Sequence, residues 1–484
     1  MRFSPFILGS LLSFTQSISM AAPPLPMGLS PKTASPSLPA GLHNTPSLPT
    51  GLSPSLPSGL NTAPALPLGI NQASLAINDQ KTEQEPWANI NGFFDMRGGI
   101  RTQNDPNEHQ MSLGEIRLQL ALQKEISIFS FNLVSDFLYD ANVDNYDISL
   151  DKGKGWIDLR EANVAFSPLD FMDVKVGRQI LTWGTGDLIF INDLFPKDWQ
   201  AFFTGRDLKY LKAPSDAVKT SIFSDFVNID FVFIPWFDAD RGLTGEKLSY
   251  FNPMQNALAG RNAIINPERP YTEEYALRLY KNIGVNELAL YAYHGFWKSP
   301  FGFNPSTGRN RYPKMRSIGA SLRRPVGKGI LNLEMGYNNS YEKNSRNDPF
   351  VPNSEARFLI GYEQEVVKNF SIGFQYYLEW LHDYKNYIAS NQKIGAPSIR
   401  KEVRHLLTNR LTLMTHQQNV TWSLFTFFSP SDIDAYFRPT VSYKVNDAWQ
   451  VEAGGNFFIG AKQSSFFGQF ENNNNVYGSV RYSF

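Results

Sequence analysis

The sequence predicts an all-β fold, a transmembrane antiparallel β-barrel of about 18 strands preceded by a disordered, proline-rich N-terminal tail. From Trp87 onward, stretches of about ten residues alternate apolar and polar side chains, as in strands with one apolar and one polar face. The connections between these stretches are alternately short and long. Aromatic residues make up 14% of the chain, which is usual where rings line both membrane interfaces.

The first 21 residues have the three parts of a secretory signal peptide. Arg2 gives a positively charged start, residues 5–14 are mainly apolar, and Ser19-Met20-Ala21 is a small-residue cleavage site. We therefore expect cleavage after Ala21 and an exported protein.

Residues 22–86 form a proline-rich, low-complexity tail with degenerate Leu-Pro-x-Gly-Leu repeats. Because proline fixes φ and lacks an N–H donor, this tail is expected to be an extended polyproline II chain. Two interpretations remain open. It is either a disordered periplasmic spacer or a set of docking sites for a periplasmic or cell-wall partner.

Residues 87–484 contain the predicted barrel. Short connections such as 124–127 and 366–369 alternate with long ones such as 237–271, as in outer-membrane barrels with short periplasmic turns and longer outer loops. An even strand number then places both termini in the periplasm. The short connection 429–433 breaks the alternation, so 16 strands remain the alternative count. The predicted strands are 87–102, 111–123, 128–139, 156–166, 172–182, 216–224, 228–236, 272–281, 286–297, 314–323, 329–340, 355–365, 370–381, 402–416, 420–428, 434–444, 448–460 and 476–484.

The last strand places Val480, Tyr482 and Phe484 on one face and Arg481 on the other. An alternating strand that ends in an aromatic residue resembles the closing strand of bacterial outer-membrane β-barrels. In that family the terminal aromatic residue belongs to the signal read by the barrel-assembly machinery. The resemblance implies that Tyr482 and Phe484 are the assembly signal and that the barrel contacts outer-membrane lipid.

If the apolar face of each strand contacts lipid, the opposite face lines the lumen. Guanidinium groups favour carboxylates and phosphates, and rings of such cations bias a pore toward anions. The alternative is that these arginines pair with neighbouring acids and only hold the barrel wall together. The predicted lumen residues are Glu115, Arg117, Gln119, Arg278, Arg323, Arg357, Arg410 and Arg481.

The segment after residue 176 combines glycines, tryptophans and both signs of charge. Its Gly177-Arg178-Gln179 strand followed by Trp183-Gly184 resembles the substrate-specific porins related to the bacterial alginate exporter. The resemblance implies that a charged and aromatic loop, 183–215, folds inward and narrows the pore. The exporter's full run of lumen arginines is not matched, so alginate itself is not implied. The predicted constriction residues are Arg178, Trp183, Asp187, Asp193, Lys197, Asp198, Trp199, Arg206, Asp207, Lys209 and Lys212.

Trp183 and Trp199 of that loop could offer flat faces to a sugar or an aromatic solute. Strand alternation places Arg178 on the same face as Val174 and Val176, and not on the face of the polar residues Lys175 and Gln179. A local bulge or valines that face the lumen would reconcile the position of Arg178. The alternative for the whole loop is that internal salt bridges simply tie it down.

Composition argues against several other classes of function. The chain has no cysteine, which excludes a lipoprotein anchor, thiolate metal sites and attached c-type haem. A net charge of zero gives no support for a nucleic-acid partner. The 6 histidines show no metal-ligand spacing and no nucleophile motif is present, so we expect no cofactor, no metal and no enzymatic activity. The prediction is a channel for small polar or anionic solutes. The alternatives are a structural barrel or a sheath around a partner such as a cytochrome and, as the least favoured, a barrel hydrolase.

Overall fold

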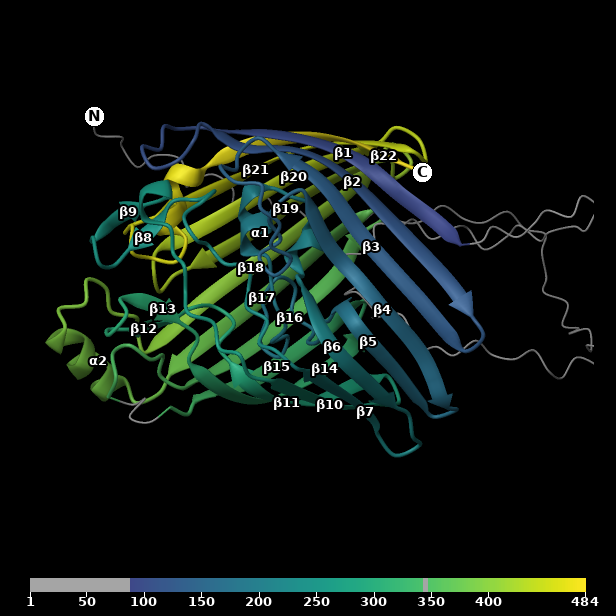
Figure 1. Cartoon of the computed structure of the whole chain (residues 1–484), viewed down its shortest axis with the longest axis horizontal. Coiled ribbons are helices and arrows are strands. Elements are labelled where there is room, and N and C mark those ends of the chain that lie inside the picture. The colour runs from purple at the N-terminus through teal and green to yellow at the C-terminus, as the bar shows by residue number, and fades with distance from the viewer. Residues whose placement is uncertain (1–87, 343–346) are drawn as a thin grey trace, which may run out of the picture. The chain divides into compact units, whose positions relative to one another are not determined.

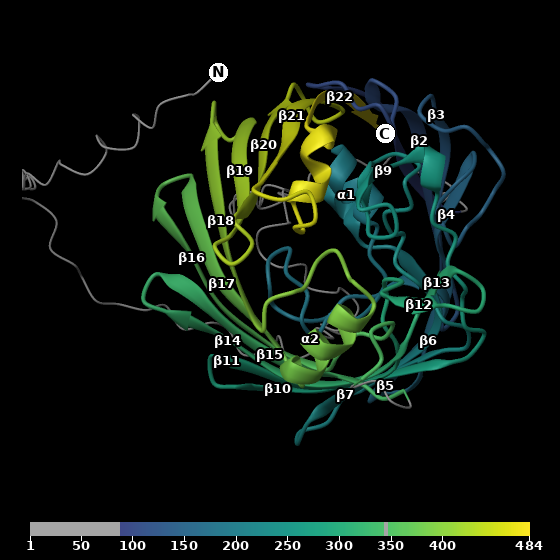
Figure 2. The same ribbon diagram turned by 90° about the vertical axis from the view of Figure 1, so that its left-hand side faces the viewer.

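A computed structural model describes residues 88–342 and 347–484, so the predicted signal peptide and proline-rich tail lie outside the described residues. Eighteen antiparallel strands form one sheet that closes on itself (Figures 1 and 2). These strands are β1 (Asn89–Arg101), β2 (Met111–Ile126), β3 (Phe129–Asp140), β4 (Ile157–Leu169), β5 (Met172–Ile180), β6 (Pro214–Ile222), β7 (Asn228–Ile234), β10 (Glu274–Ile283), β11 (Asn286–Phe296), β14 (Lys314–Val326), β15 (Gly329–Ser340), β16 (Glu355–Val367), β17 (Phe370–Leu381), β18 (Val403–Thr415), β19 (Val420–Ser429), β20 (Asp434–Lys444), β21 (Trp449–Gly460) and β22 (Asn475–Ser483).

The barrel closes through β1 and β22, which pair from Phe93 with Ser483 to Arg101 with Asn475. The predicted count of eighteen strands is confirmed, and the alternative count of sixteen is wrong. The short link between β19 and β20 is a genuine tight turn, since the amide of Ile433 donates to the carbonyl of Ser429 at 2.9 Å.

The connections differ at the two ends of the barrel. At one end, the short-turn end, strands are joined by links such as 127–128 and 327–328. The first strand begins and the last strand ends there, because Asn89 pairs with Gln123 and Tyr482 with Trp449.

At the other end, the long-loop end, longer connections carry small elements of their own (Figure 1). These are the hairpins β8 (Tyr250–Asn252) with β9 (Ala257–Ala259) and β12 (Gly302–Asn304) with β13 (Arg309–Arg311), the helices α1 (Trp199–Thr204) and α2 (Tyr384–Lys393), and the 3₁₀ helices η1 (Leu208–Leu211), η2 (Arg261–Ala263) and η3 (Gly468–Asn473). No helix in the described part of the chain has the length and apolar character needed to cross a membrane.

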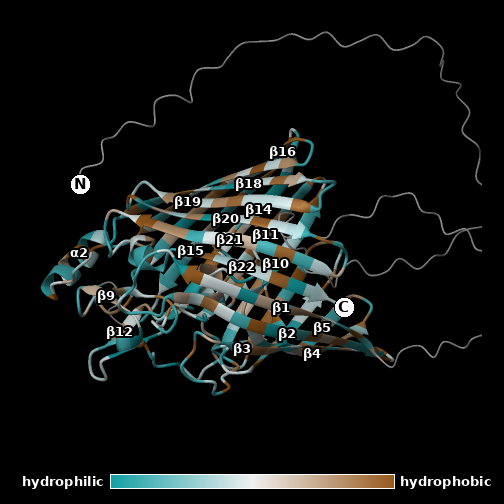
Figure 3. Cartoon of the chain, turned by 90° about the horizontal axis from the view of Figure 1, so that it is seen from above, coloured by the Kyte–Doolittle hydropathy of each residue, from teal (hydrophilic) through white to brown (hydrophobic). Residues whose placement is uncertain are grey.

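The outer face of the barrel is apolar. Hydrophobic and hydrophilic residues alternate along the strands (Figure 3), and outward side chains such as Ile318 and Leu290 are 64% and 58% exposed. Exposed aromatic rings collect near both ends, as expected for a barrel with two membrane interfaces. Near the long-loop end these include Tyr139, Tyr275, Trp380 and Phe428, and near the short-turn end Phe129, Phe171, Trp422, Tyr443, Trp449 and Tyr482.

Candidate functional site

The connection between β5 and β6, residues 181–213, folds against the inner face of the barrel wall, and we call it the inner segment. Figure 2 shows its helix α1 within the ring of strands. Helix α1 begins after Asp198, whose side chain accepts a hydrogen bond of 2.7 Å from the amide of Ala201. It ends at Gly205, whose φ of 93° favours glycine. The chain therefore turns sharply after α1 and continues into η1.

Glu334 on β15 holds the first part of the inner segment. Its buried carboxylate accepts hydrogen bonds from the backbone amides of Thr185 (3.2 Å), Gly186 (3.1 Å) and Asn192 (3.2 Å). The side-chain amide of Asn192 donates to it as well, at 2.9 Å. A buried carboxylate requires such donors because an unpaired charge away from water is costly. Glu334 therefore fixes the path of this stretch along the wall.

Two paired glycines of the wall allow this close approach. Gly319 on β14 lies directly opposite Gly336 on β15. A Cβ atom on Gly319 would overlap the side chain of Asn192, and one on Gly336 would lie 2.7 Å from Cγ2 of Ile191. The missing side chains leave the room that Ile191 and Asn192 occupy.

A second attachment joins the inner segment to β17 and β18. Asp187 accepts hydrogen bonds from Nε and Nη2 of Arg410 at 2.5 and 2.7 Å, a bidentate pair. The backbone of Asp187 also donates to and accepts from the side-chain amide of Gln375, at 2.7 and 2.8 Å. One predicted constriction residue and one predicted lumen residue are thus brought together.

Helix α1 packs its apolar side chains against inward-facing rings of β20 and β21. Phe203 lies 5.6 Å from the ring centroids of both Tyr436 and Phe458, and Phe202 lies 5.8 Å from that of Tyr436. All four rings are no more than 3% exposed. The inner wall near the long-loop end is therefore partly apolar, and the inner segment covers it. The same cluster includes Leu188, Ile189, Ile191, Leu359, Tyr377, Leu406, Phe425, Phe427, Phe467 and Phe470.

The two tryptophans of the inner segment contact phenylalanine rings. Trp183 meets Phe195 edge-on at 4.9 Å. Trp199 lies over Phe203 at 6.1 Å, and its Nε1 donates to Asp240 at 3.1 Å. Both indoles are half-buried, so only part of each ring remains accessible to a solute.

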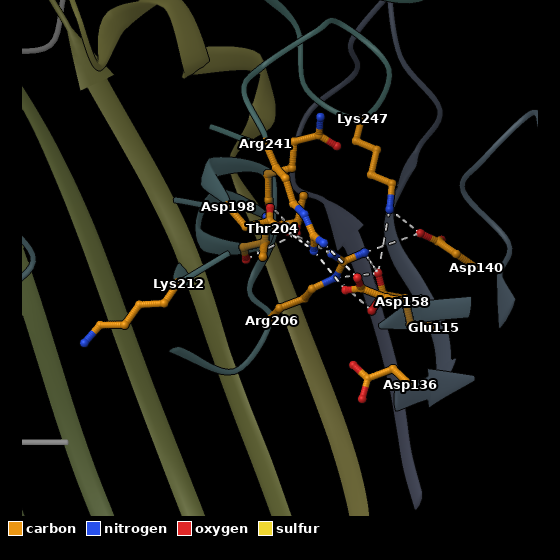
Figure 4. Close-up of polar contacts among 12 residues, drawn as sticks. Glu115, Asp136, Asp140, Asp158, Asp198, Thr204, Arg206, Lys212, Arg241 and Lys247 are labelled. Carbon is orange, nitrogen blue, oxygen red and sulfur yellow. Dashed lines mark hydrogen bonds and ion pairs between the residues drawn. The ribbon is translucent and has the colours of Figure 1, made fainter. Parts of the chain in front are cut away.

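A buried cluster of charged side chains ties the end of α1 to β2 and β3 (Figure 4). Nε of Arg206 lies 2.6 and 2.9 Å from the two carboxylate oxygens of Glu115. Glu115 also pairs with Arg117 at 3.2 Å, and Arg117 donates to Asp136. Each of these four residues is no more than 8% exposed. Buried charges are tolerated only when each is paired and hydrogen-bonded, and this set meets that condition.

Two cations from the connection between β7 and β10 complete the charged cluster (Figure 4). Arg241 donates to both carboxylate oxygens of Asp158 at 2.8 and 2.7 Å, and its Nη1 lies 3.5 Å from Asp198. Lys247 pairs with Asp140. The cluster therefore joins two long connections to the wall formed by β2, β3 and β4.

The predicted lumen residue Arg481 bridges the closing strands to η1. Its Nη1 donates to Asp207 at 2.8 Å and its Nε to Asp95 on β1 at 3.0 Å. Burial raises the pKa of Asp207, but the positive charges of Arg481 and Lys209 lower it by a larger amount. The pKa of Asp207 therefore lies well below its usual range. Asp207 therefore remains a charged partner of Arg481 at neutral pH.

Two lysines of the inner segment have no carboxylate within ion-pair distance among the described residues. Nζ of Lys209 lies 3.2 Å from Oε1 of Gln119 and 3.8 Å above the ring of Phe93. The side chain of Lys209 keeps part of its surface exposed, and desolvation by its neighbours lowers its pKa to about 8. Burial also lowers the pKa of Lys212, and Figure 4 shows its amine pointing away from the charged cluster.

The other predicted lumen arginines lie beside acids. Arg278 pairs with Glu287 at 3.3 Å, and Arg357 donates to Glu355 at 2.8 Å. Arg323 is the register partner of Glu287 across β11 and β14. Much of the predicted positive charge of the lumen is therefore balanced locally.

The remaining predicted constriction residues make separate contacts. Arg178 lies on the strand face of Val174 and Val176, with Nη1 3.0 Å from Asp216, and the pairing register of β4 with β5 continues through it without a bulge. It does not join the contacts of the inner segment described above.

Asp193 and Lys197 form a buried pair at 2.9 Å. Thr182 donates to Asp193 at 2.8 Å, so this pair closes the inner segment on itself.

Sequence reasoning missed several residues of this site. Asp136 and Asp140 alternate with the exposed Phe137 and Tyr139, so the period of β3 could have identified both acids. The same alternation applies to Glu334, which lies beside the exposed Met335, but nothing comparable marks Arg241 and Lys247 in an irregular loop. The missed residues are Asp136, Asp140, Asp158, Arg241, Lys247 and Glu334.

Within residues 88–342 and 347–484, no group of three or more His, Cys, Asp or Glu side chains is placed to hold a metal ion.

No protein-family model matches this chain, and no curated protein matches it. Among solved structures, OccAB4 of Acinetobacter baumannii aligns with a TM-score of 0.51 and 9% identity over 83% of this chain and 99% of that chain. OccD3 (OpdP) of Pseudomonas aeruginosa aligns with a TM-score of 0.46 and 9% identity over 82% and 91%. A variant of the Rh. blastica porin aligns with a TM-score of 0.37 and 11% identity over 82% and 100%. At 9% identity, the alignment with OccAB4 shows a likeness of fold alone, that of a closed antiparallel β-barrel.

Proposed function

We propose that this protein is an outer-membrane channel through which small polar solutes diffuse, and that the inner segment narrows its pore. The observation that carries the proposal is the placement of a charged segment inside a closed barrel with an apolar outer face. In such barrels, charge and size of the lumen groups decide what passes.

In this proposal the long loops face the outside of the cell and both termini face the periplasm. Short periplasmic turns and longer outer loops are the usual arrangement of these barrels. The short-turn end carries the start of β1 and the end of β22, which supports this orientation.

We propose a modest preference for anionic solutes, supported by Lys209 and Lys212. Arg410, Arg278 and Arg357 are balanced by acids, whereas these two lysines lack a carboxylate partner among the described residues. A full ladder of unpaired arginines is not present there, so strong anion selectivity is not proposed. The resemblance to porins related to the alginate exporter stays an interpretation of the Gly177-Arg178-Gln179 and Trp183-Gly184 motifs.

The test is single-channel recording of the purified full chain in planar lipid bilayers under a potassium chloride gradient. We expect discrete conductance steps and a reversal potential that favours chloride by a small factor. Lys212→Gln should shift the reversal potential toward potassium, because it removes a charge from the lumen. Lys152→Gln, which removes an exposed charge from the β3–β4 loop, is the matched control.

Two outcomes would count against the proposal. A folded barrel that never conducts would favour the structural role, such as a sheath around a partner. If Lys212→Gln and the wild type both conduct with the same reversal potential, Lys212 does not contribute to selectivity, although the protein is still a channel.

A further inference from the structure

Arg316 on β14 has no carboxylate partner among the described residues. It lies on the outer face of the barrel near the long-loop end, on the same strand face as the exposed Ile318. Arg178 lies on the strand face of Val174 and Val176. Unlike Arg316, it has a carboxylate partner, because its guanidinium pairs with Asp216 at 3.0 Å. Arg316 therefore presents an unbalanced positive charge at the edge of the exposed apolar surface.

Neighbouring side chains hold this guanidinium in place. Nε of Arg316 donates to Nδ1 of His294 at 3.2 Å, and Cζ lies 4.3 Å from the ring centroid of Tyr341. The Tyr341 hydroxyl lies 3.4 Å from Nε2 of His294. Nδ1 of His294 thus accepts from a guanidinium that stays charged at any relevant pH. The positive charge of this cluster belongs to Arg316.

The position of Arg316 along the barrel matches the border between apolar and polar surroundings. On one side of it the outward residues are apolar and exposed, with Ile318, Leu290 and Met335 at 64%, 58% and 52%. On the other side Lys314 is exposed and the long loops begin. Cations and tyrosines at this border lie at the depth of lipid headgroups.

Lys314 is a second cation on the same strand face. The neighbouring acid Glu342 accepts from Nη1 of Arg311 and from the backbone amide of Lys314, both at 2.9 Å. The carboxylate of Glu342 is thus already paired with Arg311. No ion pair to an acid is found for Arg316 or the Lys314 side chain in the described ranges.

We propose that Arg316, positioned by His294 and Tyr341 and assisted by Lys314, binds the phosphate of a membrane lipid headgroup. A guanidinium presents N–H groups in a fork that fits phosphate oxygens, and an ammonium adds a second point charge. The exposed apolar residues on one side of Arg316 supply the surface for the acyl chains of the same molecule. Charge complementarity and the apolar border together identify a phosphate-bearing lipid as the occupant.

The proposal can be tested by native mass spectrometry of the purified full chain in a neutral detergent. The probes are dioleoyl phosphatidylglycerol, which carries a phosphate, and monogalactosyl dioleoylglycerol, which does not. We expect tighter binding of the phosphatidylglycerol to the wild type. Arg316→Gln should weaken that binding about tenfold, because it removes the charge-assisted contact with the phosphate.

Matched variants separate the site from general effects of charge and folding. Arg309→Gln removes an exposed arginine of the β12–β13 hairpin that contacts the carbonyl of Asn266, and it should bind the lipid as the wild type does. Arg316→Lys keeps the charge without the fork and should give an intermediate affinity. It keeps the test usable if Arg316→Gln does not fold, as judged by circular dichroism.

Three results would overturn the proposal. The first is that Arg316→Gln binds phosphatidylglycerol as tightly as the wild type does. If only Arg316→Lys folds, the same comparison applies to that variant. The second is equal binding of the two lipids by the wild type. The third is complete displacement of the lipid by millimolar inorganic phosphate, which would identify a site for the free anion instead of a lipid.

Discussion

Lys209 is the residue of the inner segment whose charge depends on pH near neutrality. Desolvation lowers its pKa to about 8, so its ammonium loses a proton as pH rises from 7 to 9. We expect the preference of the channel for chloride to fall over that range in bilayer recordings. The direction follows from the loss of a positive charge in the lumen.

A guanidinium provides the control for this titration. Lys209→Arg stays charged at every relevant pH, so its chloride preference should fall less than that of the wild type between pH 7 and 9. A wild-type-like loss in Lys209→Arg would show that another group titrates.

Single positions show how far alternation predicts a residue's surroundings. The period of two puts Glu115 and Arg117 on one face of β2, and both side chains are buried. It could not supply their partners, because Arg206 is 91 positions from Glu115 and lies in a loop without periodicity. The same limit applies to Asp207 and Arg481, which are 274 positions apart. Strand patterning therefore predicts the face that a charge occupies but not the charge that balances it.

At the scale of elements, the strands were predictable and the elements inside the loops were not. Each of the eighteen predicted strand ranges overlaps an observed barrel strand, because a two-residue period sustained over about ten residues is a strong signal. Helix α1 and the hairpins β8–β9 and β12–β13 are too short to show a period of their own. In α1, Phe202 and Phe203 are ordered by the rings of the wall, which local sequence does not contain.

The path of the inner segment depends on Glu334, so a change of this residue should loosen the segment. Glu334→Gln replaces an acceptor oxygen with an amide donor, so at least one of the buried donors from Thr185, Gly186 and Asn192 loses its partner. Such a loss costs about 1–3 kcal/mol. Amide hydrogen exchange of Thr185 and Gly186 should therefore accelerate about tenfold or more, while the strands of the barrel keep their protection.

The matched control for this prediction is Glu125→Gln at the exposed end of β2. It should leave the exchange of the inner segment unchanged. Equal protection of Thr185 and Gly186 in Glu334→Gln and wild type would show that other contacts, such as the Asp187–Arg410 pair, suffice to hold the segment.

For the whole molecule, closure of the barrel depends on the seam between β1 and β22. Phe484 extends that seam beyond β22, because its backbone exchanges two hydrogen bonds with Gly92, at 2.9 and 3.0 Å. Its ring is 53% exposed on the outer face, next to Tyr482. Phe484 thus combines a backbone contribution to closure with an exposed aromatic side chain.

Two variants separate these contributions. Deleting Phe484 removes both the ring and the seam hydrogen bonds, whereas Phe484→Ala removes the ring alone. If the assembly machinery reads the ring, both variants should lower the amount of folded barrel in cells at least several-fold. Only the deletion should also slow refolding of purified chain into detergent micelles, because only it leaves backbone groups of Gly92 unpaired at the membrane-facing seam. Ser483→Ala should behave as the wild type in both assays, and normal assembly of Phe484→Ala in cells would show that the aromatic ring is not the signal.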